Sequence, residues 1–172
     1  ASTGGWESGV PLGTFNSGTQ ANPGVDDATD CHTMAYVTGN TGTTGSDQDV
    51  DGGATILTSP VFDLTGLVNP AINYTRWFYN GGGSGSPNDS LNIYLTNGLT
   101  TVLVETVIET SPLNSTLVQK SYDITTLIAP TANMKVIVRT ADASPGHITE
   151  AGFDKFFITN FVGIDENVAN NN

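Results

Sequence analysis

Residues 89–96 read Asp89-Ser90-Leu91-Asn92-Ile93-Tyr94-Leu95-Thr96, an alternation of polar and apolar side chains. Successive side chains of a β-strand point to opposite faces, so Leu91, Ile93 and Leu95 share one face. Residues 133–140 repeat the pattern with Met134, Val136 and Val138 on one side. We expect both segments to be strands whose apolar face is buried in the core.

Similar runs recur along most of the chain, bounded by Gly, Pro, Asn and Asp, while helical periodicity is almost absent. The predicted strands cover residues 33–38, 55–58 continuing into 61–64, 71–80, 89–96, 101–109, 116–124, 133–140 and 152–159. This pattern indicates an all-β fold, a two-sheet antiparallel β-sandwich of jelly-roll type, with a closed barrel as the alternative. Residues 1–50 contain few apolar positions, and we expect long loops around one short strand.

The charge balance restricts the partners of this chain. Its 172 residues include 5 Lys and Arg against 17 Asp and Glu, a formal net charge of −12. Nucleic acids and anionic membranes are bound through cationic side chains, so neither is expected as a partner. No apolar run approaches the roughly 18 residues that span a bilayer, so membrane insertion is not expected. The length fits one domain, and we expect a monomer.

Carboxylates without nearby cations indicate a metal site. Eight Asp and Glu residues precede Arg76, and no Lys or Arg does. Such a concentration repels itself unless it is spread out or gathers a cation. Asp47-Gln48-Asp49-Val50-Asp51-Gly52-Gly53 spells D-x-D-x-D-G, the first half of a calcium loop, in which the carbonyl group of Gly53 would be a further ligand.

The loop does not continue as an EF-hand, because position twelve is Thr58 rather than Glu. A further carboxylate must then come from elsewhere, and Glu7 and Asp154 are the candidates. Glu150 lies about 13 Å from Asp154 in a regular strand, so only one of the two can serve unless Gly152 forms a bulge.

We therefore predict a Ca²⁺ site that staples the N-terminal loops. Its ligands would be Glu7, Asp47, Asp49, Asp51, Gly53 and Asp154. The alternative is that these aspartates only solvate a turn. Zinc is a weaker candidate, because His32 and His147 are far apart in sequence and Cys31 is adjacent to His32. We expect Cys31 to be buried.

Residues 71–80 carry aromatic side chains on both faces of the predicted strand. If Ile72, Tyr74 and Phe78 face the core, Trp77 and Tyr79 face outward and could stack on a sugar. The candidate residues for binding a glycan or a protein ligand are Trp77, Tyr79, Tyr94 and Asn73. The alternative is that Trp77 and Tyr79 pack under the N-terminal loops, and Arg76 then needs Asp63 or Glu105 as an internal partner.

Catalytic signatures are absent from the sequence, which contains neither H-E-x-x-H nor G-x-S-x-G. Glu105 and Glu109 would lie about 13 Å apart on a strand, beyond the ~6.5–9.5 Å of a glycosidase pair. We therefore expect a non-catalytic module with a ligand of its own, or a purely structural spacer.

Several short segments, in this order and spacing, carry a family resemblance. They cover residues 6–14, 36–40, 49–64, 74–80, 104–107, 130–134 and 150–156. With them the chain resembles the MAM-like, cleaved-adhesin-like jelly-roll modules of secreted Bacteroidetes-type proteases, notably zinc carboxypeptidases, and of other exported multidomain proteins. The match extends from Trp6 to about Thr159.

The resemblance implies a calcium-stabilised jelly-roll domain over residues 1–160, without catalytic residues and located outside the cell or on its surface. It also implies neighbouring domains of a parent chain and a role of the kind that adhesion modules have. Residues 161–172 resemble the linker that precedes a type IX secretion sorting domain, which would have been removed. Lys155 departs from the pattern, because an acidic residue is expected after Asp154.

Overall fold

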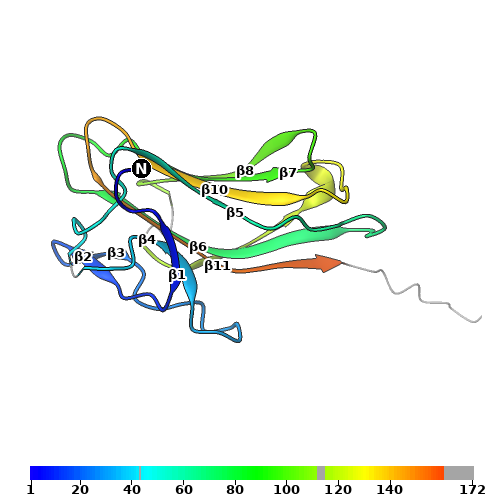
Figure 1. Cartoon of the computed structure of the whole chain (residues 1–172), viewed down its shortest axis with the longest axis horizontal. Helices are drawn as coiled ribbons and strands as arrows, with labels where there is room; N and C mark the ends of the chain where they lie inside the picture. The colour runs from blue at the N-terminus through cyan, green and yellow to red at the C-terminus, as the bar shows by residue number, and fades with distance from the viewer. Residues whose placement is uncertain (43, 112–114, 161–172) are drawn as a thin grey trace, which may run out of the picture.

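Two antiparallel sheets, packed face to face, form the computed structural model, which describes residues 1–42, 44–111 and 115–160 (Figure 1). The five-stranded sheet has the order β1 (Trp6–Gly9), β4 (Ala35–Thr38), β11 (Ile148–Asn160), β6 (Pro70–Gly81) and β9 (Val118–Asp123). The four-stranded sheet has the order β5 (Gly53–Thr58), β10 (Lys135–Asp142), β7 (Ser90–Thr96) and β8 (Thr101–Ile108). A hairpin of β2 (Thr14–Asn16) and β3 (Thr19–Asn22) and a 3₁₀ turn, η1 (Ile124–Thr126), complete the described elements.

From β4 onward the chain passes from one sheet to the other at every connection except the β7–β8 hairpin. This confirms the predicted β-sandwich of jelly-roll type in place of a closed barrel. Within the described residues, no helix has the length and apolar character needed to cross a membrane. The predicted linker, residues 161–172, lies outside the described residues.

Alternation in the sequence locates the core correctly. Leu91, Ile93 and Leu95 of β7 are fully buried, and the β10 residues Val136 and Val138 face them across the strand pairing. The N-terminal region differs from the prediction, because the described residues among 1–50 form four short strands rather than one. These strands have three or four residues each, which is too short to show a period in the sequence.

An ion pair lies between the two sheets. The β7–β8 register moves from Ile93↔Glu105 to Tyr94↔Leu103, and the extra residue turns Glu105 inward. Arg76 of β6, 3 % exposed, donates to one oxygen of Glu105 from Nε at 3.2 Å and from Nη2 at 3.1 Å. The sequence predicts Asp63 or Glu105 as the internal partner of Arg76, and the structure selects Glu105.

Two further groups complete the surroundings of Glu105. The Tyr74 hydroxyl donates to the second carboxylate oxygen at 2.8 Å, and Lys120 Nζ lies 3.4 Å from the first. Burial, with the Glu105 charge as the second cause, raises the pKa of Tyr74, so its hydroxyl remains a donor. Glu105 is therefore held by side chains of β6 and β9 in the opposite sheet.

Replacing Glu105 by Gln should lower the free energy of unfolding by about 3 kcal/mol, because it leaves the buried Arg76 charge without a counter-charge. The urea midpoint should fall with an unchanged slope. Glu7→Gln, a change at an exposed glutamate of β1 measured without added Ca²⁺, should stay within about 0.5 kcal/mol. Equal losses in both variants would contradict this account of the ion pair.

Candidate functional site

The aromatic surface predicted on β6 is covered. Trp77 is 4 % exposed and Tyr79 8 %, so neither ring can stack on a ligand. The Trp77 indole N–H donates to the Ala21 carbonyl at 2.7 Å, and Asn16 Nδ2 donates to the Tyr79 hydroxyl at 2.7 Å. Both partners belong to the β2–β3 hairpin, so the prediction of a ligand site at Trp77 and Tyr79 is wrong and the alternative, packing under the N-terminal segment, holds.

The two other predicted ligand residues are not brought together with this strand face. Asn73 lies on the outer face of β6, where its amide donates to the Ala71 carbonyl at 3.2 Å and to Thr159 Oγ1 at 3.1 Å. Tyr94 lies on β7 of the opposite sheet, between the buried residues Ile93 and Leu95. The outer faces of a sandwich look in opposite directions, so Asn73 and Tyr94 cannot share one ligand.

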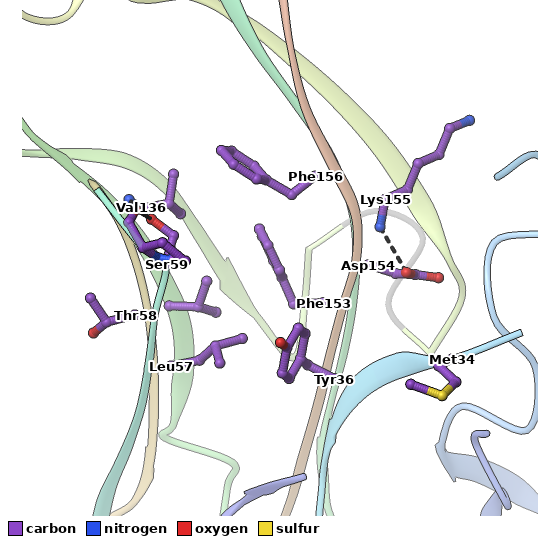
Figure 2. Close-up of a pocket in the computed structure, with 12 residues that line it drawn as sticks. Met34, Tyr36, Leu57, Thr58, Ser59, Val136, Phe153, Asp154, Lys155 and Phe156 are labelled. Atoms are coloured by element: carbon purple, nitrogen blue, oxygen red, sulfur yellow. Dashed lines mark hydrogen bonds between the residues drawn. The ribbon is translucent and has the colours of Figure 1, made fainter. Parts of the chain in front are cut away.

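A groove of about 260 Å³ opens instead between the two sheets. One wall comes from β4 and β11 and the other from β5 and β10. Figure 2 shows the side chains of Tyr36, Phe153, Phe156 and Leu57 facing into the space between these walls. Tyr36 is 45 % exposed, so its ring is available to a molecule that enters from solvent.

A bulge in β11 shapes this groove. Its register with β6 shifts between Asp154 and Phe157, and Lys155 has a φ of 50°. As a result Phe153 and Phe156 lie on the same side of the strand, and the side chains of Asp154 and Lys155 leave from the other side (Figure 2). The bulge gives the groove two aromatic rings where regular alternation would give one.

The opposite side of the bulge holds the loop of residues 26–30. Asp154 Oδ2 accepts the Asp27 backbone N–H at 2.8 Å, and Lys155 Nζ lies 3.8 Å from Asp27 Oδ1 and donates to Thr29. Burial raises the pKa of Asp154, with backbone hydrogen bonds acting against it and the charges of Asp30 and Asp26 adding to it. Lys155 therefore places its ammonium group in this acidic cluster.

Another acidic cluster lies near the D-x-D-x-D-G loop. Asp49 is buried, and burial followed by the charges of Asp51 and Asp142 raises its pKa to about 6. Burial also raises the pKa of Glu150 to about 9, to which the Asp49 charge contributes. Asp51 is exposed, and its Oδ2 accepts the Thr3 hydroxyl at 3.2 Å.

The remaining predicted calcium ligands take other places. Asp47 Oδ2 accepts the Thr44 N–H at 3.2 Å, Glu7 is exposed on β1, and Gly53 begins β5 with a φ of 116°. Calcium binding at this loop stays a prediction. Cys31, expected to be buried, is exposed.

In the part of the chain that the structure describes, one group has three side chains spaced to hold a metal ion, and it consists of Asp89, Asp142 and His147. None of the predicted ligands belongs to it. This group is not evident from the sequence, because the three residues are far apart along the chain and form no motif. The signal that could have found it is topological, since all three lie at or next to strand ends.

No protein-family model and no curated protein matches this sequence. Among solved structures, the chain is similar to TmCBM61 in complex with β-1,4-galactotriose. That comparison has a TM-score of 0.42 and 11 % identity, and it covers 76 % of this chain and 73 % of the other. Similarity at this level assigns neither a family nor a ligand, so the resemblance to MAM-like modules stays a prediction.

Proposed function

We propose that this chain is a non-catalytic binding module and that the groove between β4–β11 and β5–β10 binds a glycan. The observation that carries the proposal is the half-exposed ring of Tyr36 at the mouth of an aromatic-lined groove. Sugar rings have apolar C–H faces, and a flat aromatic side chain offers such a face a large contact area at small entropic cost.

The chemistry around the groove fits a small ligand with hydroxyl groups. The side chain of Tyr36, one of the lining residues, carries a hydroxyl group that can both donate and accept hydrogen bonds. Ser59 is already engaged, because its hydroxyl donates to the Pro60 carbonyl and accepts the Val136 N–H. A volume of about 260 Å³ is below the usual range for drug-sized ligands, so we propose that one terminal unit of a glycan enters.

The wider setting follows from the sequence resemblance and is part of the same proposal. The module acts outside the cell or on its surface, as a monomeric domain beside other domains of an exported parent chain. Binding to a glycan there would hold a neighbouring domain near its target, which is the use that adhesion and accessory modules make of such a site. A purely structural spacer would not need an accessible tyrosine ring in an aromatic-lined groove.

Tyr36→Ala should weaken binding of the recognised glycan about tenfold, because a buried aromatic contact at a binding site contributes about 1.4 kcal/mol or more. Tyr36→Phe should retain most of the affinity, since it keeps the ring. A glycan array with the wild-type chain identifies the ligand, and titration calorimetry then compares the variants.

Tyr94→Ala is the matched control, because Tyr94 is a partly exposed tyrosine on the opposite sheet. It should bind like the wild type. Loss of binding in Tyr94→Ala with retention in Tyr36→Ala would place the site on the other sheet. If the wild-type chain binds no glycan on the array and no polysaccharide, the result would favour a purely structural spacer.

We also propose that Ca²⁺ binds through the loop of residues 47–53. A chelator should then lower the melting temperature by about 10 °C relative to a thousandfold excess of Ca²⁺ over its Kd, because the ion binds only the folded state. Scanning calorimetry of Asp49→Ala should show no response to Ca²⁺. Asp63→Ala is the control, because it removes a carboxylate from a different loop, and it should respond to Ca²⁺ like the wild type. If Asp49→Ala and Asp63→Ala respond to Ca²⁺ equally, the assignment of the site to residues 47–53 is wrong.

A further inference from the structure

Three potential metal ligands meet at one end of the sandwich. Asp89 immediately precedes β7, Asp142 ends β10, and His147 immediately precedes β11. Figure 1 shows the β6–β7 and β10–β11 connections side by side at this end, and the Ser84 N–H donates to the Gly146 carbonyl between them at 3.3 Å. One ligand atom from each of the three side chains lies within 4.8 Å of the others.

His147 has an unusual environment for a buried histidine. Its side chain is fully buried, and neither Nδ1 nor Nε2 has a hydrogen-bond partner within the protein. Buried polar groups are nearly always hydrogen-bonded, and leaving one unsatisfied costs about 1–3 kcal/mol. Nδ1 lies 3.8 Å from Asp89 Oδ2, which is too long for a hydrogen bond. This separation is close to the spacing of about 3.4 Å between two ligands of a tetrahedral ion with bonds near 2.1 Å.

Asp89 is held in place by a shell of donors. Its Oδ2 accepts Asn80 Nδ2 at 3.0 Å and the Thr149 hydroxyl at 3.1 Å, and its Oδ1 accepts the Ala143 N–H at 2.7 Å. Metal-binding carboxylates are typically oriented by outer hydrogen bonds of this kind. The carboxylate is therefore fixed in position before any ion binds.

Asp142 lies where the buried group reaches solvent, and its carboxylate adds negative charge to the group. It is half-buried, its Oδ1 accepts the His147 N–H at 2.9 Å, and the adjoining residues 143–146 are exposed. Burial raises the pKa of Asp142, the hydrogen bond from His147 opposes this, and the charges of Asp89 and Asp51 add to it. A divalent ion would relieve this repulsion.

We infer that Asp89, Asp142 and His147 form a binding site for a divalent transition-metal ion, with Zn²⁺ as the ion that suits them best. One imidazole with two carboxylates is a ligand set for zinc-like ions, whereas Ca²⁺ takes six to eight oxygen ligands. The site is distinct from the glycan groove. It adjoins the predicted calcium loop, because Asp142 pairs with Gly53 in the β5–β10 ladder, but no predicted calcium ligand belongs to it. Its ion would tie the β6–β7 and β10–β11 connections together.

The test needs a chain in which other zinc ligands are removed. We would use untagged protein carrying C31S and H32Q as the reference, because Cys31 and His32 are exposed and adjacent. After chelation and dialysis, Zn²⁺, Mn²⁺ and Ca²⁺ are titrated separately. Zn²⁺ should bind once per chain by native mass spectrometry and raise the melting temperature by about 10 °C at a thousandfold excess over its Kd. Mn²⁺ should give a smaller rise.

H147Q in this background should lose the Zn²⁺ response and keep any response to Ca²⁺. Its melting temperature without metal should not fall, because His147 has no hydrogen bonds through its ring to lose. If H147Q does not fold, D142N serves instead, since Asp142 is half-buried. Co²⁺ should give a visible absorption band in the reference chain that H147Q lacks.

Three results would overturn the inference. The first is a Zn²⁺ response of equal size in the reference chain, H147Q and D142N. The second is stabilisation by Ca²⁺ alone, which would remove the imidazole from the ligand set. The third is a reference chain that none of the three ions stabilises. Each is independent of glycan binding, so failure here leaves the proposed function unaffected.

Discussion

The ion pair between Arg76 and Glu105 is the constraint from which the arrangement of the sandwich follows. A buried guanidinium must meet its carboxylate, because an uncompensated buried charge costs several kcal/mol. This requirement sets which face of β6 is internal, and it needs the β8 irregularity that turns Glu105 inward. With Arg76 inside, Tyr74 and Phe78 also face the core, and Trp77 must face outward.

The outward face of β6 in turn explains why the N-terminal residues fold. Trp77 and Tyr79 would expose large apolar surfaces on the outside of the sheet if nothing covered them. The β2–β3 hairpin has few apolar residues, yet it accepts the Trp77 indole N–H and donates to the Tyr79 hydroxyl. Because the hairpin covers these two rings, the aromatic surface predicted from the sequence is not accessible. An accessible aromatic groove arises instead where the β11 bulge turns Phe153 and Phe156 to the same side.

Period-two alternation was sufficient to predict the sandwich, because a half-buried strand must alternate. It located β7 and β10 and their core residues, and it left two alternatives for the faces of β6. Of the short strands of residues 1–50, only β4 was predicted. β1 is held by pairing with the distant β4 rather than by its own pattern, and the strands of the β2–β3 hairpin are too short to show a period. The group of Asp89, Asp142 and His147 depends on which strand ends adjoin, and this is a property of the topology. Tyr36 was missed because its exposure depends on how β4 and β11 lie relative to β5 and β10 of the other sheet, which the sequence of β4 does not show.

The two acidic clusters differ in how their charge is compensated. Around Asp27 and Asp154 the protein supplies its own cation, because Lys155 reaches Asp27 and backbone N–H groups bind Asp154. Near Asp49 burial raises the pKa of Glu150 to about 9, so protonation removes one negative charge at neutral pH. Asp89 and Asp142 have no ammonium or guanidinium among the contacts of the described residues, and the buried group that faces them is an imidazole without hydrogen bonds. This difference is why the proposed external cation lies at Asp89, Asp142 and His147, whereas the acidic cluster at the β11 bulge already has a cation of the protein's own.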